Sequence, residues 1–369
     1  MAAIDPTFPL YSVACILAAA LLLLLQLSSL VRQNNNLGIS FLCFWAFFEN
    51  LFYAVNTIVW SDNADIKLDV YCDIVTHVMI ISYVVKPLTT LTLMRRLYLI
   101  ASLRDVDLSA HINRRDRLIG WMMGLVLPVL VAGPVYYTVQ GSRFEVLEGF
   151  GCRSSPYPAI LATLLIYGWL FIPPLVSVFI YYPRVLWLFY RQNREINRYL
   201  NSNTSASISR MNYLRILALA SIDVVLTLPI GITTLATSLL PQTNRQSVPF
   251  YRGWKTVHSD WTPQSITYVE LKSAREYNAV AWVYIAYWTS PMLAFAIFGL
   301  FGLTQQARET YWRALRTVAA WCRWDPSILR VRHHSARMDR IDFTSRVLEN
   351  PPRYARSLLE IPTFSWLDR

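Results

Sequence analysis

Long apolar stretches, separated by short polar segments, recur through the first 302 of the 369 residues. Each stretch is long enough to cross a bilayer, because a helix of about 20 apolar residues spans a hydrocarbon core of roughly 30 Å. There are seven such stretches, at residues 9–31, 38–60, 70–100, 118–138, 159–182, 213–240 and 277–301. The pattern predicts an all-α fold, a seven-transmembrane helix bundle.

The composition favours the same interpretation. Hydrophobic residues make up 54% of the chain and charged residues 15%, whereas soluble domains average about 45–50% and 25%. The first stretch is longer than the apolar core of a secretory signal and follows only an acidic residue, Asp5, so we expect a retained helix. The sequence therefore predicts a multi-pass protein, placed here at the plasma membrane.

The distribution of Lys and Arg predicts the orientation, because short cytoplasmic loops are enriched in both. Arginines gather in the second and third loops of one side and in the segment after Thr304. The opposite side carries fewer basic residues, although its third loop also contains several, Lys255 among them. We expect the N-terminus outside and the C-terminus in the cytoplasm. The net charge of +11 then follows from topology and needs no nucleic-acid partner.

After the last span, apolar residues spaced four apart share one helical face, while arginines lie off that face. The apolar positions are Leu303, Ala307, Tyr311, Leu315 and Ala319. This pattern predicts an amphipathic helix on the inner membrane surface. We expect three parts: a bundle over residues 1–302, the amphipathic helix over 303–322, and a flexible basic tail over 323–369. Cys322 is a chemically plausible site for palmitoylation, and an unmodified thiol is the alternative.

The other cysteines divide by compartment. Cys15 and Cys43 fall inside spans, whereas Cys72 starts the third span on the outer side and Cys152 lies in the second outer loop. Outside the cell is an oxidising space in which disulfides persist. We expect Cys72 and Cys152 to be bonded, which would hold the second outer loop over the mouth of the bundle.

Three charged residues lie well inside predicted spans, away from their ends, where an unpaired charge is costly. They are Glu49 in the second span, Lys86 in the third and Asp223 in the sixth. A Glu49–Lys86 ion pair would neutralise both charges, and Asp223 is a competing partner for Lys86. Two interpretations stay open: a polar switch that breaks on activation, or a structural pair that fixes helix register.

The motifs of several functional classes are missing. The seventh span has no lysine to carry a retinal, no His-Glu-x-x-His run is present, and no Gly-rich phosphate loop occurs. We expect neither enzyme activity nor a metal or cofactor. A signalling receptor and a small transporter or channel remain. The first and last three spans show no convincing resemblance of the kind found in many transporters, and the basic inner loops suit protein docking, so a receptor is favoured.

Several segments then carry a sharper resemblance. They are residues 50–60, Cys72-Asp73-Ile74, Arg95-Arg96-Leu97-Tyr98, Gly151-Cys152, the run with Trp254, His258 and Trp261, and residues 298–311. Their order and spacing resemble the fungal lipopeptide (a-factor type) mating-pheromone receptors, class D G-protein-coupled receptors, and favour a basidiomycete member. Two departures are Tyr71, where a tryptophan is expected, and Lys86.

The resemblance implies a receptor for a secreted farnesylated peptide pheromone. A prenyl chain already in the membrane has collected most of its burial energy, so discrimination should come from polar and shape contacts at the outer end of the bundle. We expect ligand contacts from Asn56, Trp60, Asp73, His77, Trp254, His258 and Trp261. For each of these residues, interfacial anchoring or packing is the alternative.

The resemblance also implies a heterotrimeric G protein as partner and the mating response as output. Ligand binding would open an inner cleft for the C-terminal helix of a Gα subunit. We expect its border to include Arg95, Arg96, Arg184, Arg194, Arg210 and Arg215, although positive-inside topology alone would explain most of them. Membrane lipid is a further partner, and a homodimer stays open.

Overall fold

The computed structural model describes residues 7–31, 37–102, 109–187, 190, 204–239, 248–274 and 279–321. Among these residues, six helices are long and apolar enough to cross a membrane, and a bent pair of helices supplies a seventh. The first three are α1 (Leu10–Val31), α2 (Leu37–Val59) and α3 (Asp69–Ser102). Each begins within one residue of the span that the hydrophobic pattern predicts.

The fourth and fifth spans are helical but irregular. The fourth comprises α4 (Ser109–Trp121), η2 (Met122–Val126), α5 (Leu127–Leu130), η3 (Val131–Val135) and α6 (Tyr136–Val139). The fifth comprises α7 (Ile160–Ala162), η4 (Thr163–Tyr167), η5 (Gly168–Leu170), α8 (Ile172–Val176) and η6 (Ser177–Tyr181). The parts called η2, η3, η4 and η6 are π-helical, whereas η5 is a 3₁₀ turn.

The fifth span differs from the straight helix that the pattern suggests. Its two halves, Ile160–Leu170 and Ile172–Trp187, meet at an angle of 46°. Pro173 and Pro174 follow the break directly, and neither can donate the backbone hydrogen bond that would continue the preceding helix. The proline pair thus accounts for the bend.

The last two spans are α10 (Thr204–Leu239) and α13 (Ala279–Ile297), which continues into η7 (Phe298–Gly302). The helix α14 follows at Gln305–Trp321, close to the predicted bounds of 303–322. The chain divides into two compact units, residues 1–313 and 314–369, so the boundary falls within α14. Cys322 and the predicted tail lie outside the described residues, and membrane attachment of α14 stays a prediction.

Burial in this bundle is inverted relative to a soluble protein. The charged and amide side chains of Glu49, Asn50 and Asp223 are buried. Large apolar side chains face outward instead, and Val225 and Phe179 are 70% and 73% exposed. Such a surface is stable in hydrocarbon, where lipid tails solvate apolar groups and polar groups must find partners inside the protein.

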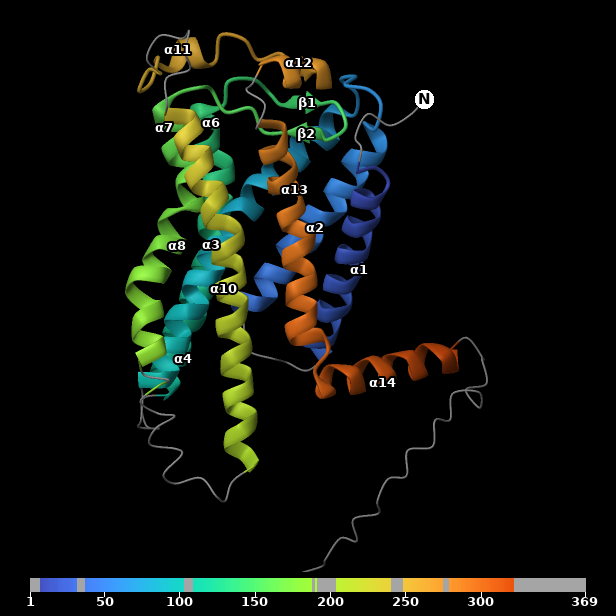
Figure 1. Ribbon diagram of the computed structural model, residues 1–369, viewed down its shortest axis with the longest axis vertical. Helices are drawn as coiled ribbons and strands as arrows, with labels where there is room; N and C mark the ends of the chain where they lie inside the picture. The colour runs from blue at the N-terminus through green and yellow to red at the C-terminus, as the bar shows by residue number, and fades with distance from the viewer. Residues whose placement is uncertain are drawn as a thin grey trace, which may run out of the picture. The chain divides into compact units, whose positions relative to one another are not determined.

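A small sheet covers one end of the bundle (Figure 1), next to the short helices α11 (Trp254–Val257) and α12 (Tyr268–Ala274). Its strands are β1 (Glu145–Leu147), β2 (Gly151–Arg153) and β3 (Gln264–Ile266). β1 pairs antiparallel with β2 and parallel with β3, so the order is β2-β1-β3. The all-α prediction missed this sheet, which joins two loops more than 100 residues apart.

The β1–β2 hairpin plugs the end of the bundle. Phe144, Leu147 and Phe150 have at most 1% exposure and belong to one buried cluster with Tyr53 and Trp60 of the second span. Further hydrogen bonds fix the plug. The amide of Gly149 donates to the carbonyl of Trp60 at 2.8 Å. The three loops at this end, over residues 60–68, 140–159 and 248–267, are therefore one packed unit, which we call the cap.

A disulfide between Cys72 and Cys152 ties the hairpin to the start of α3. The neighbouring Gly151 has φ +79°, and a Cβ built on it would lie 2.6 Å from Cβ of Asn56 and 3.0 Å from Cε3 of Trp60. Glycine is needed here for two reasons, because an L side chain is strained at this φ and has no room. The hairpin approaches α2 as closely as it does only because of this residue.

We predict that Gly151→Ala destabilises the protein by about 2–5 kcal/mol, from left-handed strain of roughly 1–2 kcal/mol and overpacking of about 1–3 kcal/mol. Thermal unfolding of the purified protein measures it. Gly253→Ala is the matched control, since Gly253 has φ +86° and an added Cβ would meet nothing within 4 Å. Equal losses for the two variants would show that the close approach of the hairpin contributes nothing.

Candidate functional site

Two of the expected ligand residues are fully enclosed by the cap. Asn56 and Trp60 are 0% exposed. Asn56 Nδ2 donates to the carbonyl of Cys152 at 3.1 Å, and its Oδ1 accepts from the Tyr71 hydroxyl at 3.0 Å. Trp60 Nε1 donates to the carbonyl of Asp65 at 2.9 Å. In this state Asn56 binds the hairpin and Trp60 binds the first loop and packs beneath the hairpin, so their ligand contacts stay a prediction that requires the cap to move.

Asp73 and His77 lie on the first turns of α3. Asp73 accepts two hydrogen bonds from the Arg143 guanidinium, from Nε at 3.0 Å and Nη2 at 2.6 Å, and both side chains are 35% exposed. The hydrogen bond to Asp73 raises the pKa of Arg143 above its ordinary value. His77 lies close by, in an edge-to-face arrangement with Tyr136 in which the ring centroids are 5.8 Å apart. A ligand that used Asp73 would have to share or displace Arg143.

The other three expected residues form an aromatic cluster on the third loop of the cap. His258 stacks on Trp254 and Trp261, with ring centroids 4.1 Å and 5.8 Å apart. Its Nε2 lies 2.9 Å from the carbonyl oxygen of Tyr137, at the end of the fourth span. Trp254 and Trp261 remain 48% and 39% exposed. These rings, unlike Asn56 and Trp60, offer free surface to a ligand or to lipid headgroups.

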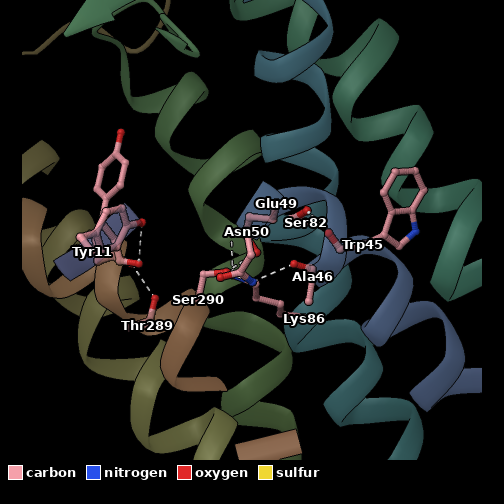
Figure 2. A network of polar contacts seen from close by, with 11 residues as sticks. Tyr11, Trp45, Ala46, Glu49, Asn50, Ser82, Lys86, Thr289 and Ser290 are labelled. Carbon is pink, nitrogen blue, oxygen red and sulfur yellow. Dashed lines mark hydrogen bonds and ion pairs between the residues drawn. The ribbon is translucent and has the colours of Figure 1, made fainter. Parts of the chain in front are cut away.

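The intramembrane residues form a buried network (Figure 2). Lys86 reaches from α3 to Glu49 of α2, with Nζ 2.7 Å from the carboxylate. The Ser290 hydroxyl of α13 donates to Glu49 Oε2 at 2.9 Å and accepts from Asn50 Nδ2 at 3.0 Å. One carboxylate therefore connects the consecutive spans α2 and α3 to α13, which is about 240 residues away. The pair that the sequence suggested is present, and Ser290 is an addition.

Asp223 occupies a separate position on α10. Its Oδ2 accepts from the Thr90 hydroxyl at 2.5 Å, whereas its Oδ1 is buried without a hydrogen-bond partner. Thr90 follows Lys86 by four residues on α3, and Asp223 lies within electrostatic range of Lys86. Lys86 is thus paired with Glu49. Asp223, bound to Thr90 one turn further along α3, keeps one unsatisfied oxygen.

The predicted inner arginines are not equivalent. Arg95 Nη1 donates to Asp116 Oδ1 of α4 at 2.9 Å, and Arg96 Nε lies 3.5 Å from Oδ2 of the same residue. Arg184 is exposed and Arg215 is half-buried. Arg194 and the side chain of Arg210 lie outside the described part of the chain. Asp116 was not among the residues that the sequence singled out.

Sequence reasoning identified the charged residues but missed several of their partners. Arg143, Ser290, Thr90 and Asp116 each bind a predicted residue across helices or loops. Hydroxyl residues are common in membrane helices, so nothing in the sequence distinguishes Ser290 or Thr90 from the others.

The sequence matches a known family of membrane receptors. The model of the Pheromone A receptor family matches residues 10–320, which includes all seven spans, the cap and most of α14. The chain belongs to the Pheromone A receptor family. The predicted family and fold class are therefore confirmed, and the protein is a multi-pass membrane receptor by family.

Named relatives in this receptor family come from several fungi. The chain is 30% identical over 330 residues to the Pheromone B alpha 3 receptor of Schizophyllum commune, covering 86% of this chain and 48% of the relative. It is 26% identical over 320 residues to Pheromone receptor 1 of Mycosarcoma maydis, covering 85% and 86%. The Pheromone M-factor receptor of Schizosaccharomyces pombe is 24% identical over 274 residues, covering 68% and 71%.

The chain spans about half the length of the Schizophyllum relatives that it matches. The matched half contains the bundle, since the family model extends from residue 10 to residue 320. The family match therefore covers the membrane domain of this chain.

We predict that Lys86→Met destabilises the receptor by about 3–5 kcal/mol, because it leaves the Glu49 carboxylate buried without its cation. Glu49→Gln should cost a similar amount by stranding Lys86. The double variant removes both charges, keeps an amide for Ser290 to bind, and should recover most of the loss. Thermal unfolding in detergent measures all three.

Lys272→Met is the matched control, since Lys272 is exposed at the cap end of the chain; it should change stability little. Losses that simply add in the double variant would contradict a coupled ion pair between Glu49 and Lys86.

Proposed function

We propose that the chain is a receptor for a secreted farnesylated peptide pheromone that activates a heterotrimeric G protein and the mating response. The single observation that carries this proposal is the family match over residues 10–320. The names of the relatives, which include an M-factor receptor and several numbered pheromone receptors, support a peptide pheromone as ligand. The farnesyl group and the G protein come from the resemblance noted in the sequence.

The cap supports an outside position for the N-terminal end. It contains a disulfide, and disulfides persist in oxidising compartments. With the cap outside, an odd number of spans would put α14 and the inner arginines in the cytoplasm, in agreement with the positive-inside pattern. In this orientation the exposed cluster of Trp254, His258 and Trp261 faces the medium from which a secreted peptide arrives.

A chain of contacts leads from the cap to the buried ion pair. The ring of Phe150 in the hairpin lies 4.7 Å from Tyr287 of α13, which also contacts Tyr53 at 4.9 Å. Tyr287 and Ser290 are three residues apart and so lie on one face of α13. Ser290 in turn holds Glu49. A ligand that shifts the hairpin would move Tyr287 and alter the hydrogen bond to the carboxylate.

The network offers a second state. In the resting state Lys86 pairs with Glu49, while Asp223 keeps an unsatisfied buried oxygen. Leaving a buried charge unsatisfied costs free energy, so movement of α3 against α10 that brings Lys86 to Asp223 would recover part of this cost. That movement would leave Glu49 with only its hydrogen bond from Ser290, so the second state needs a bound ligand to populate it. We favour this polar switch over a purely structural pair, and it would couple the cap to the inner ends of α3 and α10.

The function is tested by GTPγS loading of a fungal Gα by the full chain in membranes. A panel of farnesylated peptides is compared with the same peptides lacking the prenyl group. We expect stimulation by particular prenylated peptides, and at least tenfold weaker potency for the unprenylated forms. Folded protein that loads no Gα with any peptide would contradict the proposed coupling and turn attention to transport assays.

A second prediction concerns the inner surface. Arg215→Glu, on the half-buried face of α10, should abolish peptide-stimulated loading, because it replaces a positive charge with a negative one where we expect the Gα helix to bind. Peptide binding and surface expression should not change. Arg252→Glu, an exposed arginine of the cap, is the control for the charge change. Normal signalling by Arg215→Glu would remove this residue from the docking surface.

A further inference from the structure

Asp116 is the one acidic residue among basic neighbours at the inner end of the described bundle. Arg114, Arg115 and Arg117 flank it on α4 and are exposed. Its own carboxylate is 19% exposed and binds Arg95 and Arg96 of α3 instead. The two oxygens are used separately, with one for each arginine. A single carboxylate therefore contacts both of the arginines for which we expect a role in coupling.

The geometry of α3 shows what this contact does to the arginines. Met94 and Leu97 are buried with Val185 of the fifth span and with Leu217 and Ala220 of α10. Successive residues of an α-helix are 100° apart, so Arg95 and Arg96 lie on the sides of α3 turned away from that cluster. Their long side chains could otherwise bend around the helix end toward it, and Asp116 holds them on the side of α4.

We propose that Asp116 is a positioning residue that clamps Arg95 and Arg96 against α4 in the resting receptor and releases them when a G protein binds. The proposal rests on the proposed G-protein coupling. In the clamped state the two positive charges are held away from the meeting point of α3, the fifth span and α10. Release supplies both guanidinium groups to the carbonyl groups or carboxylate at the end of the incoming Gα helix.

If Asp116 is a clamp, replacing it raises basal Gα loading; if it only stabilises the fold, replacing it lowers loading. Asp116→Asn should raise Gα loading in the absence of peptide by about 5- to 30-fold, the effect of one to two kcal/mol on a two-state equilibrium. A residue that only stabilised the fold would lower loading when it was replaced. Asp116→Glu, which keeps the charge, should restore loading to near the resting level.

The experiment measures GTPγS loading of a fungal Gα by the full chain, with and without prenylated peptide. Glu309→Gln is the matched control, because it removes one negative charge from an exposed position shortly after the last span; it should leave basal loading unchanged. Peptide-stimulated loading by the wild type combined with unchanged or lower basal loading by Asp116→Asn would overturn the clamp alone. Absence of loading by every form would overturn the proposed coupling and the clamp together.

If Asp116→Asn does not fold, hydrogen exchange on the wild-type chain gives the answer. Release of Asp116 predicts faster amide exchange in α4 when Gα is bound than when it is absent. Unchanged or slower exchange in α4, with Gα binding confirmed, would overturn the clamp.

Discussion

A buried ion pair in a lipid-exposed bundle is the constraint on which the rest of this structure depends. Glu49 and Lys86 lie where neither water nor lipid can solvate a charge. Each therefore requires the other, and the carboxylate also requires Ser290. This requirement fixes the relative register of α2, α3 and α13, because a one-residue shift of any of them would separate the groups. The outer and inner ends of the bundle are built on these three helices.

The cap and the ion pair are linked through aromatic packing. The hairpin is placed by the disulfide and by the absence of a side chain at Gly151, and its Phe150 rests on Tyr287 of α13. Tyr287 is one turn from Ser290. A packed core responds to a push by changing between discrete arrangements rather than by gradual deformation. If the peptide binds at the cap, as we propose, this packing would carry a signal from the cap to the middle of the membrane.

At each end of the bundle, ion pairs hold charged side chains for which we expect a role in binding a ligand or a partner protein. Asp73 is held by Arg143 at the cap end, and Arg95 and Arg96 are held by Asp116 at the opposite end. Partly exposed pairs contribute little to stability, so they can be exchanged for a ligand or a partner protein at small cost. The buried Glu49–Lys86 pair is different, since breaking it without a substitute partner is expensive. Asp223 is the nearest candidate for that substitute.

The sequence by itself determined the helical spans, the side on which positive charge gathers and the two cysteines that are bonded. It could do so because lipid thickness and the cost of a buried charge act on each span separately, so Glu49 and Lys86 stand out within their own helices. Only the tertiary structure decided the partners. These partners depend on how close two segments that are separate in the chain come together, and the hydrophobic periodicity of one segment carries no information about that distance. This applies to the three-stranded sheet, to the enclosure of Asn56, and to the contacts of Ser290, Thr90 and Asp116.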